Sequence, residues 1–208
     1  MRFSLPAGLL MPRLEEVQYY LRGLWMLLTG KLEGFNWLDF SPRGFWRSWW
    51  AIVYCLPPTV LGWVALRATY LSLMPQGTKA GADFFSKLAV IEAANWIMPT
   101  VTLMVIANAA GFGRLIVPLI ITNNWLNVPL QWIYTIYYVI QILVPDSDLG
   151  LPLLFMLFLV SSLTAYFLII SRVLGGDRLA SVAIVLALFV SSYFTQYQLV
   201  IFFELWVS

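Results

Sequence analysis

A glutamate inside an apolar stretch is the first residue of this sequence that could do chemistry. It begins a series, recurring every three or four positions, that puts a carboxylate, an amide, a proline and a hydroxyl on one helix face: Glu92, Asn95, Pro99 and Thr102. An ionisable side chain at the centre of a bilayer costs about 2.5 to 3.5 kcal/mol on insertion scales, so it needs a partner or a purpose. The pattern indicates a proton or cation site in which Glu92 titrates. The alternative is a carboxylate near the start of the helix and the outer interface, either hydrated or paired with Lys87 or Arg67.

A longer polar stripe follows. Amides and phenols recur at spacings of three and four along an otherwise apolar helix, in the order Asn124, Asn127, Gln131, Tyr134, Tyr138 and Gln141. Such side chains cannot face acyl chains, and in membranes they form hydrogen bonds between helices that contribute about 0.6 to 2 kcal/mol each. We expect this stripe, called the polar seam below, to set helix packing or to contact a partner helix.

The alternative for the same region is a break in the helix. Pro118 and Pro129 favour an unwound segment at Asn123 and Asn124 that coordinates an ion or solute through its carbonyls. The candidate intramembrane site then comprises Glu92, Asn95, Thr102, Asn123 and Asn124.

The residue inventory leaves little room for enzyme chemistry. The chain has no histidine, and Cys55 is its single cysteine, so neither a Cys/His zinc site nor a His-based triad can form. Neither a phosphate-binding P-loop nor a Gly-rich nucleotide loop occurs. We therefore expect no catalytic residue, no metal site and no cofactor. The net charge of only +2 gives no electrostatic support for nucleic-acid binding.

The composition indicates that a bilayer surrounds the helices that carry these residues. Of the 208 residues, 61% are hydrophobic and 11% are charged, and the mean hydropathy is +0.83, whereas ordinary soluble domains carry about 25% charged residues. Aromatic residues make up 16%, and tryptophan and tyrosine gather at membrane interfaces. We expect an all-α polytopic membrane bundle. Its interfacial anchors, including an arginine that reaches the lipid phosphates, would be Trp46, Arg47, Trp49 and Trp50.

Five transmembrane helices are predicted from the apolar stretches. They cover residues 44–66, 84–109, 115–144, 149–170 and 180–203. The third stretch is either one broken span or two short ones. A single crossing puts nine of the 12 basic residues on the side of the N-terminus, whereas two crossings divide them seven to five, and the positive-inside rule favours the uneven division. We expect the N-terminus in the cytoplasm and the C-terminus outside, in a bacterial inner membrane.

Residues 1–43 are predicted to form an amphipathic segment and connector ahead of a transmembrane domain over residues 44–208. The apolar residues on one helical face are Leu14, Val17, Leu21, Leu24 and Leu28. This helix either lies on the membrane surface or packs on its own protein. In the first span, Pro57 and Pro58 remove backbone donors, so carbonyls near Tyr54 need other partners.

The start of the first span carries a resemblance to a known family. Residues 39–58 read DFSPRGFWRSWWAIVYCLPP, an aromatic and basic segment that leads into a helix with internal prolines. With an amphipathic N-terminus, five hydrophobic segments and short loops over residues 17–203, the layout resembles the Yip-family small polytopic membrane proteins. The resemblance implies a non-enzymatic integral membrane protein that acts through contacts with other membrane proteins or with lipids.

Together these features predict a scaffold or accessory subunit of a membrane protein complex, with the polar seam and the aromatic start of the first span as partner contacts. Its partners would be membrane lipids and other integral membrane proteins, including a second copy of the chain. Two alternatives stay open. One is a small transporter or channel in which Glu92 and Asn123 line the pathway of an ion or solute. The other is a lipid-handling or membrane-shaping protein that uses its amphipathic N-terminus.

Overall fold

Every regular element in the described part of the chain is a helix. The computed structural model describes residues 11–144 and 150–205. The α-helices are α1 (Leu14–Leu28), α2 (Pro42–Ser48), α3 (Ala51–Leu73), α4 (Ala82–Ala109), α5 (Ile116–Leu143), α6 (Gly150–Val173) and α7 (Arg178–Phe202). Two short 3-10 helices lie between them, η2 (Leu32–Trp37) and η3 (Gly113–Leu115). The all-α prediction is confirmed for these residues.

Four segments of the described chain are long and apolar enough to cross a membrane: Pro42–Leu73, Ala82–Ala109, Gly150–Val173 and Arg178–Phe202. They give the chain the character of an integral membrane protein. Helix α5 is also 28 residues long, but it carries the amides of the polar seam and is not one of these four segments.

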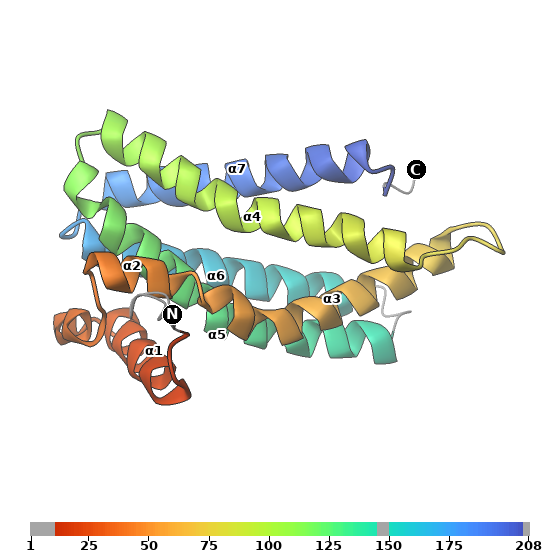
Figure 1. Ribbon diagram of the computed structural model, residues 1–208, viewed down its shortest axis with the longest axis horizontal. Coiled ribbons are helices and arrows are strands. Elements are labelled where there is room, and N and C mark those ends of the chain that lie inside the picture. The colour runs from red at the N-terminus through yellow and green to blue at the C-terminus, as the bar shows by residue number, and fades with distance from the viewer. Residues whose placement is uncertain (1–10, 145–149, 206–208) are drawn as a thin grey trace, which may run out of the picture.

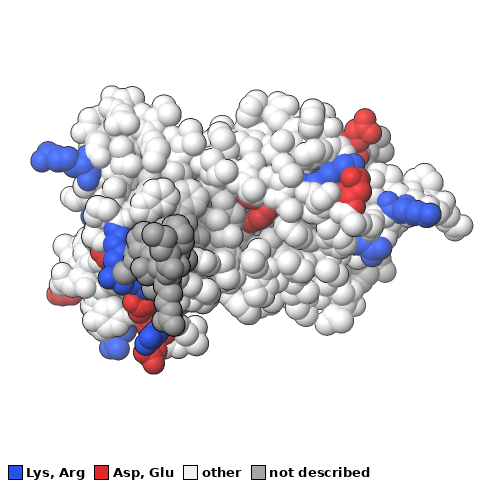
Figure 2. Space-filling view, viewed as in Figure 1, with Lys and Arg blue, Asp and Glu red and all other residues white. Residues whose placement is uncertain are grey.

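The long helices α3 to α7 run along the long axis of the molecule (Figure 1). α3 packs along α5, α4 packs along α7, and α6 contacts both α5 and α7. At one end, which we call the basic end, lie α1, residues 110–115 and residues 174–177, and the loop of residues 74–81 lies at the far end. Figure 2 shows charged side chains gathered at both ends and a largely uncharged belt between them. Such a belt is typical of a bundle that spans a bilayer.

Helix α5 is continuous from Ile116 to Leu143, so residues 115–144 do not form two short helices. Pro118 lies in the first turn, where a missing N–H costs no intrahelical hydrogen bond. The carbonyl oxygen of Pro118 accepts a hydrogen bond from the hydroxyl of Thr122, one turn further along, at 2.8 Å. Asn123 and Asn124 are helical. The alternative of an unwound segment at these asparagines is therefore wrong.

Helix α3 passes through its two prolines without ending. Pro58 cannot donate to the carbonyl oxygen of Tyr54 four residues earlier. That oxygen accepts the indole N–H of Trp132, on α5, at 3.1 Å. The predicted need for another partner at Tyr54 is confirmed, and the partner joins α3 to α5.

Helix α1 packs on the protein itself. The residues that it buries against the bundle are Val17, Tyr20, Leu24 and Leu27. Leu14 is exposed, so the buried face is rotated from the predicted stripe toward Tyr20 and Leu27. η2 crosses α1 closely, because a Cβ on Gly23 would lie only 2.8 Å from the carbonyl oxygen of Gly34. Of the two predicted alternatives for this helix, the structure has the packed one.

Some predicted boundaries differ from the observed ones. α3 continues to Leu73 instead of ending near residue 66. Arg67 therefore lies on the helix, where its Nε donates to the carbonyl oxygen of Ala80 at 2.6 Å and ties the following loop to α3. Residue 149, the predicted start of the fourth span, and residues 1–10 of the N-terminal segment lie outside the described residues.

Candidate functional site

A cavity of about 580 Å³ lies between the long helices, and all of α3 to α7 line it. Its volume falls within the roughly 300 to 1,000 Å³ of small-molecule sites. The main polar lining residues are Glu92, Asn95, Asn123, Asn127, Gln131, Tyr138, Gln141, Ser162, Tyr166, Ser192 and Gln196. The fold thus brings together the polar face of α4 and much of the polar seam of α5, which the sequence presents as separate patterns.

On α4, the carboxylate and the amide of the predicted face both line this cavity. Oε1 of Glu92 accepts the indole N–H of Trp96, one turn further along, at 3.1 Å. Oδ1 of Asn95 is buried and has no hydrogen-bond partner in the described part of the chain. Lys87 pairs with Asp83 at 3.0 Å. The predicted alternative of Glu92 paired with Lys87 or Arg67 is therefore wrong, because both cations are engaged elsewhere.

On α5, the polar seam bonds to other helices of the same chain. Oδ1 of Asn127 accepts the hydroxyl of Tyr166, on α6, at 2.9 Å. Nε2 of Gln141 donates to Oγ1 of Thr69, on α3, at 3.0 Å. Since Tyr166, Asn127 and Gln141 also line the cavity, these bonds hold the wall in place.

Three residues of the predicted sets point elsewhere. Asn124 is fully buried, and its Nδ2 donates to Oγ of Ser48, on α2, at 3.0 Å. Oγ1 of Thr102 donates to the hydroxyl of Ser191, on α7, at 3.0 Å. Tyr134 packs on aromatic rings of α6. Of the candidate ion or solute site, Glu92, Asn95 and Asn123 therefore meet at the cavity, whereas Thr102 and Asn124 do not line it.

Aromatic rings form the part of the wall that the sequence did not predict. The aromatic residues in the lining, besides Tyr138 and Tyr166, are Trp63, Trp96, Tyr137, Phe155 and Phe189. The ring of Tyr138 lies directly against the backbone of α3, because a Cβ on Gly62 would come within 2.9 Å of it. No spacing in the sequence could reveal this wall, since its rings come from all five long helices.

Helices α3 and α4 both line the cavity without packing closely on each other. These two helices touch at few positions, since α3 packs along α5 and α4 along α7. Both still line the cavity, with Gly62 and Trp63 on α3 and Glu92 on α4. Glu92 is partly exposed. Toward the far end, Phe84 and Leu88 pack with Trp63 and close the space.

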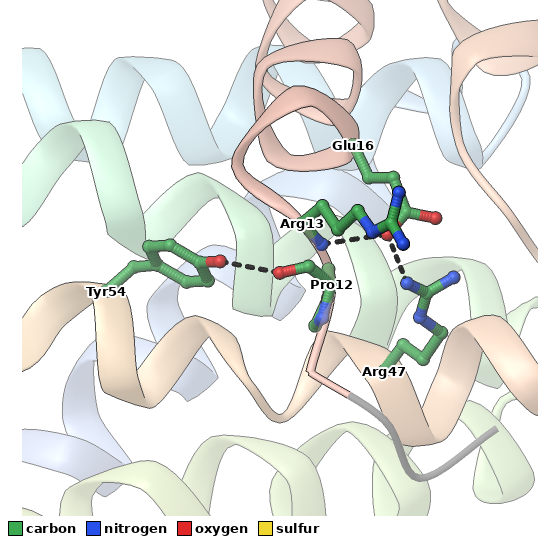
Figure 3. A network of polar contacts seen from close by, with 5 residues as sticks. All are labelled: Pro12, Arg13, Glu16, Arg47 and Tyr54. Atoms are coloured by element: carbon green, nitrogen blue, oxygen red, sulfur yellow. Dashed lines mark hydrogen bonds and ion pairs between the residues drawn. The ribbon is translucent and has the colours of Figure 1, made fainter. Parts of the chain in front are cut away.

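At the basic end, a set of polar contacts joins α1 and the residues just before it to α2 and α3 (Figure 3). Arg47 is only 6% exposed, and its Nη2 donates to Oε2 of Glu16, on α1. The same oxygen accepts the backbone N–H of Arg13 at 2.9 Å, and the Tyr54 hydroxyl donates to the carbonyl oxygen of Pro12 at 2.8 Å. The Arg47 guanidinium holds the pKa of Glu16 below its ordinary value. The prediction that Arg47 reaches the lipid phosphates is wrong, because α1 covers its guanidinium.

The tryptophans beside Arg47 differ in exposure. Trp46 is 57% exposed, whereas Trp49 and Trp50 are half-buried. Anchoring of this segment among lipid headgroups stays a prediction, and Trp46 is the residue placed best for it.

Comparisons of the chain with family models, with curated proteins and with solved structures find no match.

Proposed function

We propose that this protein binds a small molecule within the membrane, as a transporter does, and that the cavity lined by α3 to α7 is its binding site. The observation that supports this best is the convergence of Glu92, Asn95 and Asn123, from two helices, on one cavity. Within the described residues Glu92 has no ion-pair partner and Oδ1 of Asn95 has no hydrogen bond. Such groups cost free energy in an apolar bundle, and a bound ligand would offset that cost by supplying partners.

We propose that α5 is a fifth membrane-spanning helix. Its strongly exposed side chains are apolar or aromatic: Trp132, Ile133, Ile136, Val139 and Leu143. Its amides face the cavity and the neighbouring helices instead of the outside. A helix with this division is compatible with lipid on its outer face.

Charge supports an orientation with the basic end in the cytoplasm. The basic residues at that end of the described chain are Arg13, Arg22, Lys31, Arg43, Arg47, Arg114, Arg172 and Arg178. Arg67, Lys79 and Lys87 belong to the far end, so the positive-inside rule favours a cytoplasmic N-terminus and an external C-terminus. Alkaline phosphatase, which is active only outside the cytoplasm, is expected to be active when fused after Ser208. An inactive fusion with an active cytoplasmic reporter at the same place would reverse the orientation.

Neighbouring serines on α6 offer a matched test of the binding site. Ser162 lines the cavity, whereas Ser161 is exposed on the outer face. Equilibrium binding to the purified full chain in detergent is measured for three related hydrophobic probes of different charge: tetraphenylphosphonium, triphenylphosphine oxide and tetraphenylborate. We expect at least one probe to bind, and Ser162→Phe to weaken its binding at least about tenfold by filling the cavity. Ser161→Phe adds the same ring on the lipid side and should leave binding unchanged.

If no probe binds the unsubstituted chain, or if the two phenylalanine variants bind alike, the cavity is not a binding site. Circular dichroism and gel filtration show whether both variants fold.

The scaffold or accessory-subunit function stays a prediction of the sequence. Seam residues that were expected to contact a partner helix instead bond to Thr69, Tyr166 and Ser48 of the same chain. The exposed rings of Tyr19, Trp25 and Trp46 at the basic end are the side chains that favour contact with lipid headgroups or a partner there. The Yip-family resemblance, the lipid-handling alternative and the bacterial inner membrane likewise stay predictions.

A further inference from the structure

The charge of the cavity wall indicates which ligands it suits. Among the described residues that line the cavity, Glu92 is the only carboxylate, and none is lysine or arginine. Trp96 donates to one of its oxygens, and no described side chain donates to the other. An anionic ligand would meet this carboxylate without a compensating positive charge, whereas a cationic ligand would pair with it.

Neutral oxygen atoms and aromatic faces add to the attraction for a cation. Asn95 lies one turn from Glu92 on the same face of α4, and its buried Oδ1 is an acceptor without a donor within the described residues. Trp63, Trp96 and the other aromatic rings of the wall surround the same space, and the π-face of an aromatic ring attracts cations. These groups come from different helices and surround one space.

The same wall does not suit an inorganic ion. The described residues contain no cluster of three or more His, Cys, Asp or Glu side chains that could hold a metal. Most of the wall is apolar or aromatic, and a space of about 580 Å³ is far larger than one ion requires. Divalent cations such as Mg²⁺ and Ca²⁺ need about six or more oxygen ligands, whereas a weakly hydrated organic cation needs one counter-charge and apolar contact.

We propose that the cavity binds lipophilic organic cations, with Glu92 as the counter-ion and the aromatic wall as the surface that covers the ligand. This inference rests on the proposed function, since it names the ligand class of the same site.

The three probes of the binding experiment separate this inference from the proposed function. Tetraphenylphosphonium and tetraphenylborate have the same shape and opposite charge, and triphenylphosphine oxide is neutral. The cation is expected to bind the full chain at least about tenfold more tightly than the other two. Binding that remains with Ser162→Phe serves as the nonspecific background in each case.

Two single substitutions on α4 then assign the preference to a residue. Glu92→Gln keeps the shape of the side chain and removes its charge, and it is expected to lower the affinity for the cation about tenfold, to that of the neutral probe. Its affinity for the neutral probe should not change, which also shows that the variant is folded. Asp83→Asn removes a carboxylate outside the cavity from the same helix and should change neither affinity.

Each other outcome overturns a defined claim. If the cation and the neutral probe bind the unsubstituted chain equally, or if the preference survives Glu92→Gln, the cation inference is wrong and the binding site remains. If tetraphenylborate binds most tightly, the charge argument is wrong in sign. If none of the three probes binds, both the inference and the proposed function fail.

Discussion

Two neighbouring asparagines on α5 reach two different regions of the molecule. Asn124 turns to the basic end, where α2 supplies the hydroxyl of Ser48 as a partner at 3.0 Å. Asn123 turns to the cavity wall, in company with Glu92 and Asn95. The same residue type is thus a packing device where a neighbouring helix completes its hydrogen bonds, and a candidate ligand contact where the helices leave space.

The acidic residues of the two regions show the same contrast. Glu16 at the basic end is held by Arg47, and the pair fastens α1 to α2. Glu92 in the cavity has a tryptophan N–H as its partner and no cation in the described chain. Loss of a carboxylate should therefore affect stability at the basic end and ligand binding in the cavity.

The largest effect on stability is expected from Glu16→Gln. Arg47 would keep its charge in a buried position without its carboxylate partner, and breaking a buried ion pair in this way costs about 3 to 5 kcal/mol. Because Glu16 is itself partly exposed, we expect a loss of about 2 to 3 kcal/mol. Denaturant unfolding in detergent measures it. Glu15→Gln, at an exposed neighbouring position, is the control. An equal loss of unfolding free energy in both variants would show that the ion pair does not stabilise the fold.

The paired asparagines give a smaller effect that compares the two regions directly. Asn124→Ala leaves a buried hydroxyl without its donor and should cost about 1 to 3 kcal/mol in the free energy of unfolding. Asn123→Ala should cost less, since its side chain faces the cavity, but should weaken tetraphenylphosphonium binding. The two variants are measured by thermal unfolding and by equilibrium binding. If both variants were destabilised equally and both bound tetraphenylphosphonium as the unsubstituted chain does, the two asparagines would have the same structural role.

Residue spacing in the sequence predicts much of the helical structure, but it does not predict which polar side chains face the cavity and which ones bond at the basic end. The sequence predicts that α4 and α5 are helices, and it predicts the helix faces that carry Glu92 and Asn127. Apolar periodicity fixes which side chains share a face. Asn123 and Asn124 are adjacent, and Nδ2 of Asn123 donates to Oδ1 of Asn124 at 3.5 Å. Only the position of α2 decides that Asn124 is the one that bonds to another helix. The burial of Arg47 is equally invisible in the sequence, since it depends on α1 folding back across the start of the first span.

A still smaller effect is expected from the donor that orients Glu92. Trp96→Phe keeps an aromatic ring in the wall and removes the N–H that bonds to Oε1. Neutral hydrogen bonds contribute about 0.5 to 1.5 kcal/mol, so tetraphenylphosphonium binding should change by a few fold, with little change in stability. A titration with the purified variant measures it. If Trp96→Phe abolished binding of the neutral probe as well, the indole would act as wall and not as an orienting donor.

The smallest effect concerns pH at the basic end. The pKa of Glu16 is lowered in the folded protein, chiefly by its hydrogen bond with Arg47. The carboxylate therefore stabilises the fold above the ordinary glutamate pKa of 4.5, and this contribution is lost as the pH falls through the lowered pKa of the folded state. We expect a small loss of thermal stability below about pH 4. The loss should be reduced in Glu16→Gln, and an identical acid profile in that variant would contradict the assignment.

Photolabelling most directly tests the central claim, that the polar side chains lining the cavity belong to a ligand site. The full chain is illuminated with an azido derivative of tetraphenylphosphonium, and the modified peptides are identified by mass spectrometry. We predict labelling of α4 around Glu92 and Asn95 and of α5 around Asn127, suppressed by excess unlabelled cation and absent in Ser162→Phe. Labelling confined to the outer face of α6 and α7, and not suppressed by unlabelled cation, would contradict the account.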